Sequence, residues 1–169
     1  MSLIRRACLE DLPKLALVER SAASLFREVG LAWIANGDTM EPSLLDTMCR
    51  EGTVWVAVDD TDEPIAFLAA HTLDEQFHIA EVSVARSHQR RGIGAALIAA
   101  AADHARTQSF RSLTLTTYRD LHWNGPFYSA LGFVEVDSSE AGPGHLQKLR
   151  TEAEAGHDFS RRCVMTKAL

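Results

Sequence analysis

The sequence has no long apolar run, and this absence excludes a membrane protein of the helical kind. No stretch approaches the roughly 18 consecutive apolar residues that a membrane span needs. The first residues, Met1–Arg6, also lack the apolar segment of a secretory signal peptide. We therefore expect a soluble, cytoplasmic protein with no membrane partner.

Cysteine is scarce, and the histidines are not grouped. Cys8, Cys49 and Cys163 are odd in number and far apart, which excludes a disulfide framework and a Cys-x-x-Cys metal site. We interpret them as small buried apolar side chains. The seven histidines never occur in pairs at the i, i+4 spacing of a zinc-binding helix, so we predict no metal site. The sequence also lacks the Gly-x-Ser-x-Gly elbow of a serine hydrolase.

The overall composition of the sequence is that of an ordinary globular domain. The chain has 169 residues, 46% of them apolar and 24% charged, which suits one compact domain and not a disordered chain. We see no internal repeat and no linker that would divide it. The prediction is a single domain over residues 1–169.

The net charge of −6 conceals a basic segment. Residues 81–111 hold five arginines and two acids, a net charge of +3, which leaves −9 for the rest of the chain. A short basic segment on an acidic background is a poor nucleic-acid surface, which needs a broad basic face. It suits a small anionic ligand, with a cationic second ligand elsewhere.

Hydrophobic periodicity predicts a mixed α/β protein with helices on the faces of its sheet. Between residues 26 and 42 the periodicity fades, which indicates a mobile, partly apolar loop or a broken helix that either lines the acceptor pocket or covers the core. The expected strands are 2–8, 53–58, 65–71, 77–85, 113–118, 133–136 and 159–167. The expected helices are 9–25, 43–50, 91–108, 122–131 and 145–155.

The strongest functional signal is the segment Val82–Ala95. A strand leads through a basic turn into a helix that begins with Gly92 and Gly94. Free backbone N–H groups and the positive end of the helix dipole then face any anion, and glycine lets the backbone approach it. The spacing is neither Gly-x-Gly-x-x-Gly nor a P-loop, so it predicts a pyrophosphate site of another kind.

Two motifs together resemble the GNAT superfamily of acyl-CoA-dependent N-acetyltransferases. The first is Gln89-Arg-Arg-Gly-Ile-Gly-Ala95 after a strand that ends in Val84, which is similar to the Gln/Arg-x-x-Gly-x-Gly/Ala motif. The second is Asn124-Gly-Pro-Phe-Tyr128, followed by Gly132-Phe133. The predicted element order also follows that fold over nearly the whole chain. The resemblance implies a central, mostly antiparallel mixed sheet of six or seven strands, splayed in the middle between 77–85 and 112–118.

The resemblance also assigns roles in coenzyme binding. The phosphate cradle would consist of Gln89, Arg90, Arg91, Gly92, Ile93, Gly94 and Ala95. The backbone of Val82 and Val84 would contact the acyl and pantetheine arm of acetyl-CoA, and Asn124 would hold the pantetheine or cap the short helix that follows it. Edge strands of this fold often pair, which implies a possible homodimer.

Acyl transfer from a thioester to an amine needs a base, an oxyanion donor and an acid. Glu81 is the leading candidate for the base, with His78 and Glu75 as alternatives. Glu81 could instead be an ordinary solvated carboxylate on the face of its strand. The Val84 N–H is the candidate oxyanion donor. Tyr128 is the candidate acid for the departing thiolate, or else a tyrosine whose ring packs in the core.

The sequence therefore predicts an N-acetyltransferase. It would move an acetyl group from acetyl-CoA to a primary amine of a small molecule or peptide, by direct attack in a ternary complex. Two rivals stay open, a coenzyme A-binding regulatory or sensor module with little catalysis and a nucleotide-phosphate binding enzyme. An O-linked or thiol acceptor stays open as well.

Overall fold

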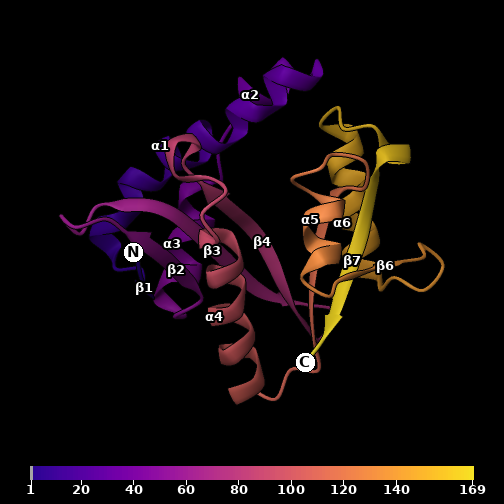
Figure 1. The fold of residues 1–169 in the computed structure, drawn as a ribbon. Coiled ribbons are helices and arrows are strands. Elements are labelled where there is room, and N and C mark those ends of the chain that lie inside the picture. Colours follow the sequence, from indigo (N-terminus) through magenta and orange to yellow (C-terminus); the bar gives the residue numbers. More distant parts are fainter. Residues whose placement is uncertain (1) are drawn as a thin grey trace. The chain divides into compact units, whose positions relative to one another are not determined.

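The computed structural model describes residues 2–169, and its elements follow the predicted order (Figure 1). The strands are β1 (Leu3–Arg6), β2 (Val54–Val58), β3 (Pro64–Leu73), β4 (Gln76–Val84), β5 (Ser112–Tyr118), β6 (Val134–Val136) and β7 (Arg162–Ala168). The α-helices are α1 (Leu12–Ala23), α2 (Ala32–Ala35), α3 (Pro42–Arg50), α4 (Ile93–Thr107), α5 (Gly125–Ala130) and α6 (Pro143–Glu154). Short 3-10 turns are η1 (Leu9–Asp11), η2 (Ser24–Val29), η3 (Arg86–His88) and η4 (Phe159–Arg161).

The strands form one seven-stranded mixed sheet in the order β1-β2-β3-β4-β5-β7-β6. The β1/β2, β2/β3, β5/β7 and β6/β7 pairs are antiparallel, whereas β4 and β5 are parallel. In the parallel pair, Phe77 lies beside Leu113 and His78 beside Thr114. The predicted fold class, a mostly antiparallel mixed sheet flanked by helices, is confirmed.

The described residues group into two compact units. The first holds the chain up to Ala70 together with Glu81–Asp103, and the second holds His71–Ala80 together with His104–Leu169. In the first unit, all five residues of β2 are buried, as its unbroken apolar run requires. Leu15 of α1, Met48 of α3 and Leu97 of α4 are also fully buried in this unit.

In the second unit, β5 pairs with β7 along its whole length, from Ser112 beside Ala168 to Tyr118 beside Arg162. α5 and α6 belong to the same unit. The hairpin between β3 and β4 turns on two residues, Asp74 and Glu75, whose φ angles are 49° and 63°. Positive φ at both central positions is the geometry of a type I′ turn, which suits the twist of the flanking strands.

The expected loop or broken helix at residues 26–42 contains η2 and the short helix α2, which confirms the broken-helix alternative. Two other points of the sequence analysis are settled by burial. Val29 and Trp33 in this segment are exposed, so these two side chains do not cover the core. Cys8 is exposed and Cys49 is half-buried, and only Cys163 is the buried side chain that we expected of all three. Cys8 lies at the exposed N-terminal end of η1, where its backbone N–H donates to Asp11.

No helix within residues 2–169 is long and apolar enough to cross a membrane.

Candidate acyl-coenzyme A site

The turn between β4 and α4 has a special backbone conformation. Arg90 and Gly92 both adopt left-handed backbone angles, with φ of 62° and 78°. A side chain at Gly92 would be strained in this conformation, and its Cβ would point into open space with no atom within 4 Å. Glycine is therefore needed here for the left-handed backbone conformation, and its lack of a side chain leaves the surface beside the helix open.

Helix α4 presents unpaired N–H groups at this turn. The Gly92 carbonyl accepts the Ala96 N–H at 3.0 Å, which is the first hydrogen bond of the helix. The N–H groups of Ile93, Gly94 and Ala95 consequently have no acceptor within the helix. Together with the dipole of a 15-residue helix, they favour an anion at this end.

The three arginines of the turn differ in their surroundings. The Arg86 guanidinium forms an ion pair with Glu28 and donates to Ser24 at 3.3 Å, and its backbone N–H donates to Ser21 at 2.9 Å. Arg90 and Arg91 are exposed at the glycine turn. Arg86 thus ties the turn to the first helical segment, while Arg90 and Arg91 supply the positive charge next to the helix N-terminus.

Gln89 closes the turn. Its side-chain Nε2 donates to the backbone carbonyl of Val84 at 2.9 Å, across the 3-10 turn η3. This hydrogen bond joins the last residue of β4 to the residue that precedes Arg90. The structure therefore gives Gln89 a positioning contact that the sequence motif did not reveal.

Glu81, the predicted base, is half-buried on β4. Its Oε1 accepts a hydrogen bond from the Ser83 hydroxyl at 2.9 Å, two residues along the strand on the same face. The carboxylate is therefore held in place but still reaches the surface. Val82 and Val84, the predicted contacts of the acyl arm, are also half-buried. Glu81, both valines and the turn at 89–95 all belong to the first unit.

Asn124 and Tyr128 belong to the second unit and lie at α5. The Asn124 carbonyl accepts the Tyr128 N–H at 3.0 Å, but its side chain makes no capping bond and instead donates to the Trp123 carbonyl at 3.3 Å. The expected side-chain cap is therefore absent. Gly125 is required by packing, because a Cβ there would lie 2.6 Å from the Arg119 carbonyl oxygen.

The Tyr128 side chain is only 7% exposed. Its ring makes edge contacts with Phe127 and Phe133, with centroids 5.2 and 5.7 Å apart. The packing role that we left open for this tyrosine is thus real, and it fixes the ring independently of any role of the hydroxyl.

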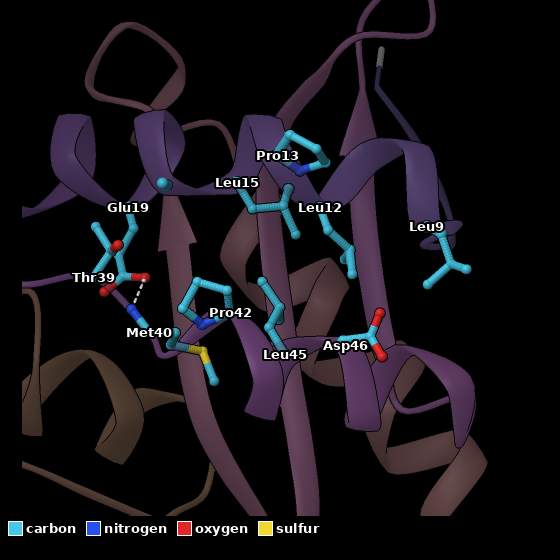
Figure 2. Close-up of a pocket in the computed structure, with 11 residues that line it drawn as sticks. Leu9, Leu12, Pro13, Leu15, Glu19, Thr39, Met40, Pro42, Leu45 and Asp46 are labelled. Atoms are coloured by element: carbon cyan, nitrogen blue, oxygen red, sulfur yellow. Dashed lines mark hydrogen bonds between the residues drawn. The ribbon is translucent and has the colours of Figure 1, made fainter.

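The first unit also contains a pocket of about 400 Å³ between α1 and α3 (Figure 2). Its wall is largely apolar and includes two carboxylates, Glu19 and Asp46. Glu19 accepts the Met40 N–H at 3.0 Å, and burial raises the pKa of its carboxyl despite this contact. Asp46 is bound by Arg50 at 2.7 Å. Both carboxylates have partners, so the pocket offers no unsatisfied charge.

Comparison with known proteins identifies the chain. The sequence pattern of the acetyltransferase (GNAT) family matches residues 22–133, about two thirds of the sequence. This chain belongs to the GNAT family of acetyltransferases. The predicted family is confirmed, and the family assigns this GNAT protein to acyl transfer from an acyl-CoA.

Solved structures show the same fold. The N-acetylglutamate synthase of Neisseria gonorrhoeae, complexed with coenzyme A and N-acetyl-glutamate, matches with a TM-score of 0.74 and 20% identity. All of our chain is covered in that match, but it spans only 35% of the synthase. The PaiA N-acetyltransferase of Thermoplasma acidophilum, in complex with coenzyme A, matches with a TM-score of 0.73 and 16% identity over 100% of our chain and 99% of its own. The ribosomal-protein-S18-alanine N-acetyltransferase of Escherichia coli matches with a TM-score of 0.68 and 16% identity over 99% and 94% of the two chains.

For this GNAT chain, the residue roles stay predictions. Glu81, Val82, Val84 and residues 89–95 belong to the first unit, and Asn124 and Tyr128 belong to the second. Within residues 2–169, no group of three or more His, Cys, Asp or Glu side chains is arranged to hold a metal ion. Sequence reasoning did not find the buried polar residues Thr114 and His145 or the half-buried Asp74, which lies 2.7 Å from His145 Nδ1.

Proposed function

We propose that this GNAT protein transfers an acetyl group from acetyl-CoA to a primary amine of a small molecule or peptide. The amine attacks the thioester directly while both substrates are bound. The C–N bond forms first and gives a tetrahedral oxyanion. When this adduct collapses, the C–S bond breaks and the sulfur leaves with its electron pair as a thiolate.

The glycine turn before α4 carries this proposal. Unpaired N–H groups of Ile93, Gly94 and Ala95 and the charges of Arg90 and Arg91 surround an open surface at Gly92. These groups suit a pyrophosphate, which is the most highly charged part of coenzyme A. Gln89 would keep the turn closed through its bond to Val84.

The acyl arm would lie along the end of β4. In this proposal, the backbone of Val82 and Val84 contacts the pantetheine and acyl groups, and the Val84 N–H donates to the oxyanion that develops during attack. Asn124 would contact the pantetheine through its side-chain amide, because that amide is not used as a helix cap.

Glu81 and Tyr128 would move the protons. An amine with a pKa near 10.4 reaches the site as an ammonium, and Glu81 would take its first proton directly or through water and pass it to solvent. The same carboxylate would then take the second proton from the nitrogen as the amide forms. The Tyr128 hydroxyl would donate a proton to the departing thiolate. Its ring is already held by Phe127 and Phe133, so the hydroxyl would not need to be ordered by the substrate.

The charge distribution supports a cationic acceptor. Outside residues 81–111 the chain carries a net charge of −9, which attracts an ammonium group and repels a second anion.

Substitution of Gly92 tests the cradle. Gly92→Ala places a methyl group on the open surface that would face the pyrophosphate, and we expect acetyl-CoA affinity to fall by about tenfold or more in calorimetry. Gly52→Ala is the matched control, because Gly52 has the same φ of 78° and its nearest neighbouring atom would be 3.9 Å from the Cβ. Both variants should lose about 1 kcal/mol of stability through backbone strain. Equal acetyl-CoA affinity in the two variants would refute the cradle.

Thiol release tests the transfer itself. The protein is incubated with acetyl-CoA and a panel of primary amines, and amine-dependent release of coenzyme A is expected. Tight coenzyme binding without turnover on any amine would instead identify the sensor module.

A further inference from the structure

The segment 24–37, which comprises η2 and α2, takes its place in the first unit without burying a side chain. Neither η2 nor α2 contains a buried residue. The left-handed Gly30, with a φ of 76°, ends η2, and the Arg27 guanidinium donates to the Asn36 side chain at the end of α2. Because a segment with few buried apolar contacts has low local stability, its position depends strongly on its polar contacts.

Arg86 makes such contacts along one face of the first helical segment. Its guanidinium pairs with Glu28 and donates to the Ser24 hydroxyl at 3.3 Å, and its backbone N–H donates to the Ser21 hydroxyl at 2.9 Å. Ser21, Ser24 and Glu28 are spaced by three and four residues, so they lie on the same face of the segment. Arg86 therefore holds the end of α1 and the whole of η2 through both its backbone and its side chain.

Arg86 is itself fixed at the end of β4. The residue before it, Ala85, donates its N–H to the Ile65 carbonyl on β3 at 2.9 Å. The bond from Gln89 Nε2 to the Val84 carbonyl, at 2.9 Å, closes the turn around Arg86. Val84 is also the proposed donor to the oxyanion. This anchor thus lies two residues along the chain from the proposed point of acyl transfer.

Segment 24–37 carries an apolar surface next to this anchor. Val29, which directly follows Glu28, is 40% exposed, and Trp33 is 43% exposed. The other large apolar side chains of the segment are half-buried, namely Phe26, Leu31 and Ile34. Large apolar side chains grouped at a surface are typical of a place where a ligand binds. An acceptor whose nitrogen reaches the end of β4 would have its carbon skeleton near this surface.

We propose that Arg86 positions segment 24–37 as an apolar wall of the acceptor site, and that the preferred acceptor is a primary amine with an apolar or aromatic body. The inference rests on the proposed function, because the amine has to reach the acyl carbon at the end of β4. Val29 and Trp33 contact the carbon skeleton of the amine, and the acidic remainder of the chain attracts its ammonium group. Arg86 touches neither substrate and is a positioning residue.

Two primary amines of different character test the substrate class. We expect kcat/KM for 2-phenylethylamine to exceed that for ethanolamine by about tenfold or more, because ethanolamine has no apolar body to place against Trp33. Trp33→Ala should remove most of this preference by raising KM for 2-phenylethylamine, with kcat/KM for ethanolamine changed less than about twofold. Phe159→Ala is the matched control, because Phe159 is an aromatic side chain of the second unit that is 52% exposed. It should keep the preference of the parent.

Substitution of Arg86 tests the positioning role. Arg86→Gln should raise KM for 2-phenylethylamine by about three- to fivefold, because the wall is in place for a smaller fraction of the time. Both kcat at saturating amine and KM for acetyl-CoA should change less than about twofold. Lys14→Gln is the matched control, since the Lys14–Glu63 side chains are 47% and 51% exposed, close to the 42% and 56% of Arg86 and Glu28. It breaks an ion pair at the other end of α1 and should keep the parent KM.

Two further variants cover a failure of Arg86→Gln to fold. Glu28→Gln breaks the same ion pair from the other side, and KM for 2-phenylethylamine should rise by a similar factor. The double variant should be no worse than either single variant, because both substitutions remove one contact. Arg86→Lys retains the positive charge and should restore most of the affinity for this amine.

The outcomes separate the two proposals. A parent protein that turns over both amines without preferring 2-phenylethylamine overturns the apolar wall alone. Arg86→Gln and Glu28→Gln variants that keep the parent KM, or that lose activity equally on both amines, overturn the positioning role of Arg86. A parent protein without turnover on any amine overturns the proposed function and, with it, the acceptor wall.

Discussion

At the scale of single residues, comparison of the two tyrosines can distinguish a packing role from a catalytic role. Tyr128 is held by aromatic neighbours, whereas the hydroxyl of Tyr118 lies 2.6 Å from His157 Nδ1. Both rings are buried, so replacement by phenylalanine keeps the packing of each and removes only a hydroxyl.

Tyr128→Phe should therefore lower kcat by about 100-fold with little change in acetyl-CoA affinity, because the departing thiolate loses its proton donor. Tyr118→Phe provides the comparison and should lose about 1 kcal/mol of stability with kcat unchanged. Steady-state kinetics and urea unfolding of both variants measure the two effects. An unchanged kcat in Tyr128→Phe would leave this tyrosine with a packing role only.

Asp11 makes a residue-scale contribution to acid stability. Its burial would raise its pKa, but two hydrogen bonds from Arg5 at 2.7 and 3.0 Å and one from the Cys8 N–H at 2.9 Å hold the pKa at about 2. The folded state thus binds this proton more weakly than the unfolded state, in which the pKa is near 3.8.

The stability from Asp11 should be fully present above pH 4 and disappear as the pH falls toward 2. The shift corresponds to about 2 kcal/mol. Urea unfolding of the parent and of Asp11→Asn at several pH values measures the difference. The difference in unfolding free energy between the parent and Asp11→Asn should decrease as the pH falls from 4 to 2. A difference that stays constant would contradict the lowered pKa of Asp11.

At the scale of elements, the hairpin tip at Asp74 and the start of α6 depend on each other. Gly142 has an ordinary φ of −68°, so alanine would bring no backbone strain there. The obstacle is the Asp74 carboxylate, 2.4 Å from the position of the new Cβ.

Gly142→Ala should therefore destabilise the protein by about 1–3 kcal/mol, the cost of overpacking. Without the carboxylate, alanine would stabilise by reducing the entropy of the unfolded chain. Asp74→Gly is the second variant of a double-mutant cycle, and the penalty of Gly142→Ala should shrink or reverse in its presence. Thermal unfolding of the four proteins gives the coupling, and a coupling near zero would refute this contact.

At the scale of the whole molecule, not every arginine of the basic segment 81–111 can attract a ligand, because some are paired within the protein. Arg86 is already engaged by Glu28 and two serines, whereas Arg90 and Arg91 stand at the glycine turn. Of the three arginines in this turn, two supply the field that would meet an anionic coenzyme.

Arg91→Gln should weaken acetyl-CoA binding by about three- to tenfold at low salt and by less at high salt, since exposed charges are screened. Arg86→Gln removes the same charge from a residue that is paired within the protein, and its effect on binding should be smaller. Calorimetry at two salt concentrations compares them. Equal losses in both variants would indicate a general charge effect without a local cradle.

Much of the fold could be predicted because its signals are local. The unbroken run at 54–58, the alanine-rich helix after the glycine turn and the Gly-Phe pair after α5 each depend on residues near in sequence. The turn at 89–95 could be predicted for the same reason, because it depends on neighbouring residues in which left-handed Gly92 directly precedes a helix. The predictions were wrong where the tertiary surroundings decide the outcome. Cys8 is exposed and not buried, and the Asn124 side chain does not cap α5.

The sequence by itself determined the order of the elements, the family and the glycine turn before α4, since each arises from neighbouring residues. Only the tertiary structure decided which histidines are buried and which polar side chains they contact. His78 and Thr114 are 36 residues apart, and Asp74 and His145 are 71 apart. No periodicity links such positions. Strand register and the docking of α6 on the hairpin bring them within hydrogen-bonding distance, and burial then makes each unpaired atom costly.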